Sequence, residues 1–240
     1  MKQTKINIIV PCYNASLNLN NLTKSLNTQK YDNWQVYFID DVSSDDTWNK
    51  LALLCTNGDK FITIKNNEKK YALKNINDAC DLIWEQSNHT EQLIVIVDGD
   101  DFLINENTFT LFNKAFNEDA LFMWTKHSWD SANQNISEEF PAGINPYQWK
   151  WVTSHARAFS LNLFEQVNKD NFKDVYGNWF VRGYDQALSL PLLTLAKDRI
   201  KFIQEVTYRY NINSVSMPNR DDGGAQLNSV KFIRSRGFLK

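Results

Sequence analysis

The first hundred residues repeat one pattern: a short apolar segment typical of a buried β-strand is followed by a stretch with apolar residues at helical spacing. This alternation constrains the fold strongly, because parallel strands need a crossover between them, and that crossover is usually a right-handed helical connection. We therefore predict an α/β fold with a parallel sheet that helices cover on both faces. The expected strands are Ile6–Val10, Trp34–Ile39, Phe61–Ile64 and Leu93–Val97; the expected helices are Leu19–Leu26, a segment capped by Ser44 or Asp45 that runs to Leu54, and Tyr71–Trp84.

The pattern becomes less regular after about residue 105. Residues 128–152 are polar, aromatic and rich in turn formers, which is typical of a functional loop or lid. Pro191 lies in an apolar helical segment, where proline is compatible only with the first turns. We expect one domain, 1–240, with a binding lobe over 1–127 and a less regular lobe over 128–240. Its further elements are helices at Thr108–Phe116, Asp185–Ala196 and Gln226–Arg236, and strands at Ala120–Thr125 and Ile200–Tyr210.

Charge and composition exclude several classes of protein. The chain has 26 basic and 28 acidic residues, and this balance gives no basic field for nucleic acid or anionic lipid. No run reaches the roughly 18 apolar residues of a membrane span, and no signal peptide is evident, so we expect no integral membrane segment and a cytoplasmic location. The cysteines are few and scattered, which favours reduced thiols over a disulfide framework or a zinc site: Cys12, Cys55 and Cys80.

Acidic residues follow two of the expected strands. Asp40 and Asp41 end the second strand, and Asp98-Gly99-Asp100 directly follows the fourth. In open parallel sheets, ligands bind beyond the carboxyl ends of the strands. Asp98 and Asp100 could share a Mg²⁺ or Mn²⁺ ion with an anionic ligand, while Gly99 leaves room for a ligand to approach. The alternative is a solvated acidic turn that caps the next helix.

A nucleotide pocket is the second expectation for this edge. Asp40 and Asp41 could accept hydrogen bonds from a heterocyclic N–H or from ribose hydroxyls, and Tyr13 could pack on a base. Each has a simpler alternative, because Asp41 could be an ordinary acid at a helix N-terminus and Tyr13 an aromatic residue at the edge of the core. Their placement on adjacent strand ends favours the pocket.

Three segments together resemble the family-2 glycosyltransferases with the GT-A fold. They are Ile8–Asn14 (IIVPCYN), Ile39–Thr47 (IDDVSSDDT) and Val97–Asp101 (VDGDD), in the family's order. Farther along, Ser154–Phe159 resembles the H-x-R-x-F element of a bacterial and viral branch. Gly183–Ala187 lies where the family carries its catalytic acid, although many relatives have Glu-Asp where this chain has Tyr184-Asp185.

The resemblance implies a mixed, mainly parallel sheet and an inverting transfer of a sugar. The donor would be a nucleoside diphosphate sugar, most often linked to uridine diphosphate (UDP), and the acceptor a hydroxyl of a glycan, glycoside or protein. A Mn²⁺ or Mg²⁺ ion held by Asp100, assisted by Asp98, would offset the charge that develops on the diphosphate. Asp185 would take the proton of the attacking hydroxyl; the simpler role for this residue is the N-cap of the helix that it begins.

Further donor contacts follow from the resemblance. Lys70 aligns with a position that faces the base or the phosphates, although it could equally be a solvated lysine. His155 and Arg157 alternate on an expected strand and would face the diphosphate or the donor sugar, with His155 as a further metal ligand. Trp149 and Trp151 could form a platform for a sugar ring or simply pack in the core. The expected donor-binding residues are Pro11, Tyr13, Asn14, Asp41, Lys70, Asp98, Gly99, His155 and Arg157.

Two other functions compete with this interpretation. In a phosphatase of the haloacid-dehalogenase type, Asp98 would attack phosphorus and Asp100 would act as the acid. That motif normally opens its domain, whereas three strand–helix units precede it here, and Asp221-Asp222 follows a polar segment rather than an apolar strand. The other alternative is a nucleotide- or sugar-binding module without turnover, from which only Asp185 distinguishes the enzyme.

Overall fold

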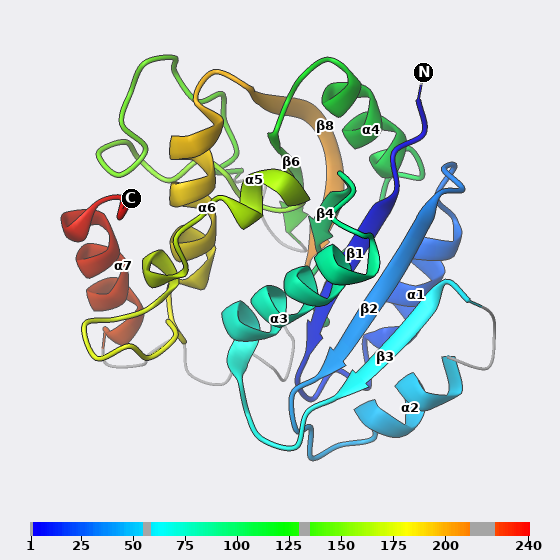
Figure 1. Ribbon diagram of the computed structural model, residues 1–240. Coiled ribbons are helices and arrows are strands. Elements are labelled where there is room, and N and C mark those ends of the chain that lie inside the picture. Colours follow the sequence, from blue (N-terminus) through cyan, green and yellow to red (C-terminus); the bar gives the residue numbers. More distant parts are fainter. Residues whose placement is uncertain (1, 55–58, 130–134, 212–223) are drawn as a thin grey trace.

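The strands of the computed structural model form one eight-stranded sheet (Figure 1). The structure describes residues 2–54, 59–129, 135–211 and 224–240, and every structural statement below concerns these residues. The strands are β1 (Ile6–Cys12), β2 (Trp34–Asp40), β3 (Phe61–Lys65), β4 (Leu93–Ile96), β5 (Phe102–Leu103), β6 (Phe122–Trp129), β7 (Arg157–Ser160) and β8 (Ile200–Tyr210). The helices are α1 (Leu19–Asn27), α2 (Thr47–Leu54), α3 (Tyr71–Gln86), α4 (Thr108–Asn117), α5 (Leu161–Glu165), the 3₁₀ turn η2 (Lys169–Phe172), α6 (Tyr184–Ala196) and α7 (Ala225–Arg236).

The strand order is β3-β2-β1-β4-β7-β6-β8-β5. The first four strands in this order are parallel, and β8 is parallel to β6, whereas β7 is antiparallel to both β4 and β6, and β5 is antiparallel to β8. The expected mixed, mainly parallel sheet is therefore confirmed. Because β1 lies between β2 and β4, the acidic ends of β2 and β4 flank the end of β1 as predicted.

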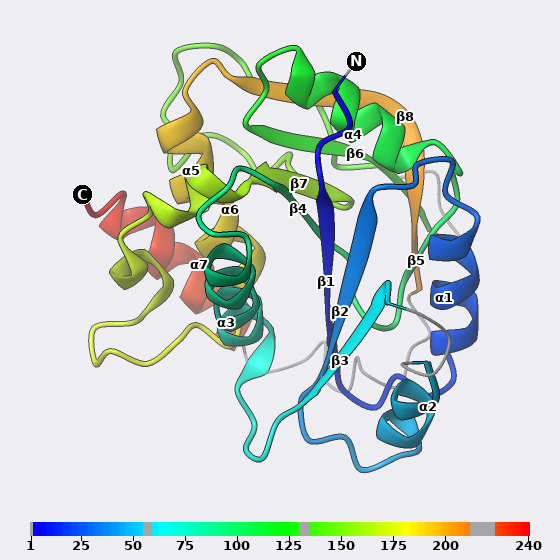
Figure 2. The ribbon, with the colours of Figure 1, turned by 45° about the vertical axis from the view of Figure 1, so that its right-hand side comes forward.

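Successive residues of the central strands enter two different cores, because side chains alternate across a sheet. On β1, Ile9 packs with α3 and α6 on one face, whereas Ile8 and Val10 pack with α1 and α4 on the other. Both cores are fully buried, which is why the central strands are almost continuously apolar. Figure 2 shows α3 on one side of the sheet and α1 on the other.

Three expectations about local structure are wrong. Pro191 is the eighth residue of α6 and so lies well past its first turns. Proline has no backbone N–H to donate within the helix, but α6 is buried along most of its length, and this packing stabilises it. His155 is not in a strand, since β7 begins at Arg157. The strand expected at Ala120–Thr125 runs instead from Phe122 to Trp129, because its later residues pair with β8.

The helix α7 joins several loops to the body of the molecule. Ile233 is buried against the core that contains α6, and Arg234 donates hydrogen bonds to the side chain of Gln186 and to the carbonyl of Tyr147. Arg236 donates to the carbonyls of Lys173 and Asn171. Part of the irregular second half is therefore tied to the main core through this one helix.

Two further points concern cysteines and membranes. Cys12 and Cys80 are buried free thiols, as expected, while Cys55 and the Asp221-Asp222 pair lie outside the described residues. Within the described part of the chain, helices fall short of the length and apolar character that crossing a bilayer requires.

Candidate functional site

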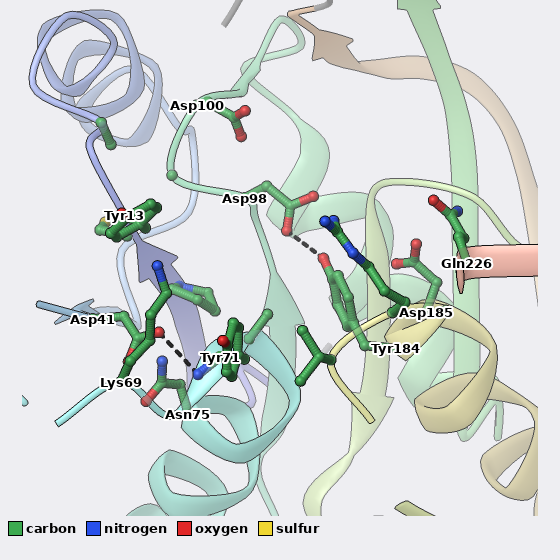
Figure 3. A pocket seen from close by; sticks show the side chains of 18 of the residues that line it. Tyr13, Asp41, Lys69, Tyr71, Asn75, Asp98, Asp100, Tyr184, Asp185 and Gln226 are labelled. Atoms are coloured by element: carbon green, nitrogen blue, oxygen red, sulfur yellow. Dashed lines mark hydrogen bonds between the residues drawn. The ribbon is translucent and has the colours of Figure 1, made fainter. Parts of the chain in front are cut away.

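The carboxyl ends of β1, β2 and β4 open into a cavity of about 510 Å³ (Figure 3). Segments that precede α3 and α6 form its other walls, together with the end of β8. The cavity is thus built from segments more than two hundred residues apart, since both Pro11 and Gln226 line it. Its lining includes the predicted residues Pro11, Tyr13, Asp41, Asp98, Gly99, Asp100 and Asp185, and also Lys69, Tyr71, Asn75, Tyr184, Tyr210 and Gln226.

At one end of the cavity, Tyr13 and Asp41 lie where a nucleoside was expected. The Tyr13 ring is 36% exposed, and the Lys69 ammonium lies 2.9 Å from its centroid. The Asp41 carboxylate accepts hydrogen bonds from the backbone N–H groups of Lys70 and Tyr71, each at 2.8 Å. Asp41 therefore caps the N-terminus of α3, which was its simpler role, and it also lines the cavity.

Lys70 and Asn14, which the sequence predicts as donor contacts, do not line the cavity, whereas Lys69, which it does not single out, does. The Lys70 ammonium pairs with Asp78 at 3.0 Å, and Lys69 lines the cavity instead. The Asn14 side chain accepts a hydrogen bond from the N–H of Ser44 at 2.9 Å and so joins two loops beside the cavity. Asp40 is fully buried below the rim. Sequence could indicate a lysine before α3 but not which of two consecutive lysines turns inward.

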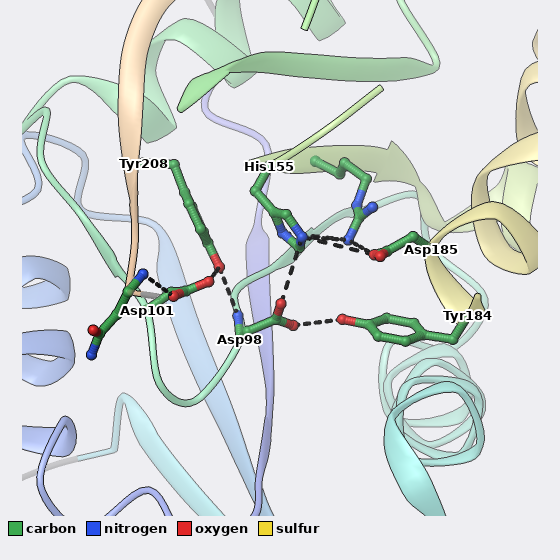
Figure 4. Close-up of polar contacts among 8 residues, drawn as sticks. Asp98, Asp101, His155, Tyr184, Asp185 and Tyr208 are labelled. Carbon is green, nitrogen blue, oxygen red and sulfur yellow. Dashed lines mark hydrogen bonds and ion pairs between the residues drawn. The ribbon is translucent and has the colours of Figure 1, made fainter. Parts of the chain in front are cut away.

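The acidic motif after β4 is anchored to β8 (Figure 4). The Tyr208 hydroxyl accepts a hydrogen bond from the N–H of Asp98 at 3.1 Å and donates one to Asp101 at 2.7 Å. The backbone N–H of Asn211 also donates to Asp101, at 2.8 Å. Residues that the sequence did not single out thus fix the loop that carries Asp98 and Asp100.

Gly99 is required by the neighbouring strand. A Cβ atom at this position would lie 2.9 Å from the Cys12 sulfur and 2.9 Å from the Pro11 carbonyl oxygen. Real Cβ atoms do not approach other atoms so closely, so the acidic loop can lie against β1 only with glycine here. From the sequence, we expected glycine at this position to leave room for a ligand. The structure shows that it also leaves room for β1.

Asp98 is unusually basic for a carboxylate. Burial, together with the negative charges of Asp185 and Asp100, raises its pKa from 3.8 to about 7. The Tyr184 hydroxyl donates a hydrogen bond to Asp98 at 2.7 Å. Tyr184 therefore links the motif after β4 to the start of α6.

Asp185 is held by a buried arginine. The Arg157 guanidinium is fully buried and forms an ion pair with Asp185, and the side chains of His155 and Arg157 lie 3.2 Å apart. His155 also lies 3.6 Å from Asp98 and 3.8 Å from Asp185. Burial and the charge of Arg157 lower the pKa of His155, so the imidazole is neutral. The helix N-cap is Gly183, so that role does not fall to Asp185.

Only two of the three expected metal ligands line the cavity. Asp98 and Asp100 line the cavity, whereas His155 does not and lies beside the Arg157 cation, which opposes a second positive charge. No cluster of three or more His, Cys, Asp or Glu side chains suited to a metal exists among the described residues. Two carboxylates that repel each other do fit a hard dication that takes its other ligands from phosphate and water.

The two tryptophans expected near a sugar differ in position. Trp151 lines a second, smaller cavity next to Asp185, whereas Trp149 lines neither cavity. The platform role is therefore kept only for Trp151.

Comparisons with known proteins identify what this fold and site resemble. The family model "Glycosyl transferase family 2" matches residues 7–172, which is more than half of the chain. A search of curated proteins found no match. None of these comparisons tests the H-x-R-x-F element, so the assignment to that branch stays a prediction.

Solved structures share the fold at low sequence identity. Residues 1–349 of TarS from S. aureus in complex with UDP superpose with a TM-score of 0.69 at 16% identity, over 98% of this chain and 67% of that one. The same protein in complex with UDP-GlcNAc gives 0.68 at 16%, over 98% and 68%. The mannosyltransferase PcManGT from Pyrobaculum calidifontis, in complex with GDP-Man and Mn²⁺, gives 0.61 at 13%, over 92% and 59%.

Proposed function

This chain belongs to glycosyl transferase family 2, and on that premise we propose that it moves a sugar from a UDP-linked donor to an acceptor hydroxyl, with inversion at the anomeric carbon. One observation carries the proposal: a single cavity holds an aromatic and cationic end at Tyr13 and Lys69, the carboxylates of Asp98 and Asp100, and Asp185. This order matches the order of base, diphosphate and sugar in a donor.

The choice of UDP rests on the polar groups that line the nucleoside end and on the ligands bound in the similar solved structures. Asp41 and Asn75 line the cavity near Tyr13, and they offer carboxylate and amide groups to a base or a ribose. TarS was solved with UDP and with UDP-GlcNAc, whereas the mannosyltransferase was solved with GDP-Man. We therefore favour UDP and treat GDP-mannose as the comparison in the test.

On the diphosphate side, Asp98 and Asp100 would hold Mn²⁺ or Mg²⁺. When bound there, the cation would supply positive charge where the leaving diphosphate becomes more negative. The ammonium of Lys69 adds positive charge to the same cavity. The Tyr184 hydrogen bond keeps Asp98 directed into the cavity, and the anchored loop keeps Asp100 beside it.

On the acceptor side, Asp185 is the proposed base. Arg157 holds its Oδ1 atom, so we assign proton acceptance to Oδ2. The buried guanidinium fixes the direction of the carboxylate, because its own position is set by β7. We further propose that residues 1–127 bind the donor and that residues 128–240 carry most of the acceptor site.

The family match disfavours the phosphatase interpretation, since residues 7–172, which include the motif after β4, match a glycosyltransferase family model. An experiment distinguishes the proposed enzyme from a binding module without turnover. We expect Asp185→Asn to keep the UDP affinity within about threefold, because the neutral amide preserves shape, and to lower kcat by about 10²–10⁴-fold, because the base is lost. The measurements are the release of UDP from UDP-sugars, the release of GDP from GDP-mannose, and UDP binding by calorimetry with and without Mn²⁺.

Two further variants complete the design. Asp100→Ala should weaken Mn²⁺-dependent UDP binding at least tenfold, and the exposed control Asp170→Asn should change neither binding nor turnover. Full transfer by Asp185→Asn would refute the base assignment. A wild-type protein that binds UDP-sugars without any turnover would show a binding module instead.

A further inference from the structure

Next to Asp185 lies a second cavity of about 200 Å³, which we call the aromatic cavity. Its walls include His127, Trp129, Trp151 and Arg157. It shares the residues Gly183, Asp185, Tyr210 and Gln226 with the larger cavity. The proposed base therefore lines both cavities.

Buried polar atoms in these walls have no partner. Both ring nitrogens of His127, the indole N–H of Trp129, and Nε and Nη1 of Arg157 lack a hydrogen-bond partner within the described part of the chain. His127 is only 3% exposed and Arg157 is fully buried. An unpaired buried polar group costs about 1–3 kcal/mol, and native proteins rarely leave several of them together. These unpaired atoms belong to side chains that surround one small cavity.

The same walls are aromatic. The rings of Trp129 and Tyr210 are stacked with their centroids 5.1 Å apart, and His127 lies 5.6 Å from Trp129. Flat apolar rings next to hydrogen-bonding groups suit a ligand with an apolar C–H face and a polar rim. A pyranose ring has both. A linear alditol or a serine side chain lacks the flat C–H face.

We propose, on the basis of the proposed function, that the aromatic cavity binds the acceptor and that the acceptor is a pyranose sugar. A volume of about 200 Å³ equals the share of roughly seven liquid waters, which is enough for one sugar ring. The neutral imidazole of His127 offers one donor and one acceptor, the pair that a hydroxyl group needs.

The position of Asp185 separates the acceptor from the donor sugar. Asp98 and Asp100 line only the larger cavity, so the diphosphate and the donor sugar belong there. The hydroxyl that attacks must approach from the side away from the diphosphate. A sugar in the aromatic cavity reaches the anomeric carbon across Asp185, which receives the proton as the new glycosidic bond forms and the bond to UDP breaks.

The test compares variants that remove the unpaired atoms and keep an aromatic ring. His127→Phe and Trp129→Phe should raise the KM for p-nitrophenyl pyranosides at least tenfold, with the KM for the UDP-sugar changed less than twofold. Removal of unpaired nitrogens should leave the melting temperature of His127→Phe unchanged or raised. The matched control is Trp149→Phe, which removes an equally unpaired buried indole N–H outside both cavities and should change neither KM.

Direct binding separates this proposal from the proposed function. Saturation-transfer NMR on the protein with UDP should show pyranoside contacts in the wild type and in Trp149→Phe, and lose them in His127→Phe. Pyranoside binding without any sugar transfer would refute the proposed function and leave the cavity assignment standing. Transfer to ribitol or to a serine peptide but to no pyranoside would overturn the acceptor assignment. An equal rise in donor KM would assign the cavity to the donor sugar and also overturn it.

Discussion

His127 lies in a wall of the aromatic cavity with an imidazole that burial keeps neutral. Burial lowers its pKa from 6.5 to about 4. Between these values the unfolded chain binds a proton that the folded chain does not bind. The stability contributed by the neutral ring is therefore present above pH 6.5 and is lost as the pH falls toward 4.

We predict that acidification to pH 4.5 costs the wild type about 2 kcal/mol more than it costs His127→Phe. Urea unfolding of both proteins at pH 7.5 and 4.5 measures this difference. Other titrating groups are present in both proteins and largely cancel in the comparison, except that His127 itself lowers the pKa of its neighbour His155. Equal losses of unfolding free energy in the two proteins would show that His127 titrates normally.

The positions of single residues could be predicted from the sequence where the backbone alone determines them. Tyr13, Asp41, Asp98 and Asp100 follow strands whose apolar sequence is unmistakable, and all of them line the cavity. Lys69 was missed in favour of Lys70, because consecutive residues differ in direction only once the turn before α3 is known. The hydrogen bond between Tyr184 and Asp98 joins positions 86 residues apart, and no local pattern encodes it.

At the scale of elements, the loop after β4 depends on β8. The Tyr208 hydroxyl bonds to both Asp98 and Asp101, and Asp101 is 2% exposed. Without that hydroxyl, a buried carboxylate and a backbone N–H each lose a partner. The geometry of the acidic motif is therefore set by a strand that follows it by about a hundred residues.

We predict that Tyr208→Phe lowers the free energy of unfolding by about 1–3 kcal/mol and weakens Mn²⁺-dependent UDP binding. The control is Tyr176→Phe, whose ring is 86% exposed and which should change neither quantity. Urea unfolding and calorimetry give the two measurements. Equal stability of the two variants would mean that the Tyr208 hydroxyl does not anchor the loop.

Strands and helices with a strong periodicity in the sequence were predictable. Elements of a few residues, and the end of a strand that depends on pairing with a distant strand, were not. The first four strands agree with their predicted ranges to within two residues. Burial on both faces demands continuous apolar sequence in β1, β2 and β4, whereas the edge strand β3 is half-buried. β5 has two residues and α5 has five, too few for a periodic signal. The aromatic cavity draws on β6, the segment before β7, the end of β8 and α7, so its existence follows from tertiary structure alone.

At the scale of the molecule, α7 determines whether the irregular second half of the chain unfolds together with the sheet. We predict that Ile233→Ala lowers the free energy of unfolding by about 2–4 kcal/mol in a single transition, because Ile233 is 1% exposed in the main core. Leu227→Ala, on the same helix but at a residue that is 56% exposed, should stay within about 0.5 kcal/mol of the wild type. Two separate transitions in urea would show that α7 and its loops unfold independently.

The anchoring of Asp101 by Tyr208 and Asn211 has a consequence for how the protein is made. A ribosome releases the acidic motif long before it releases these two partners. A nascent chain therefore cannot fix the loop after β4 until β8 has emerged, and we expect fragments that end before β8 to lack the geometry of this loop. Premature stop products would thus not compete with the finished enzyme for nucleotide sugars in the cell.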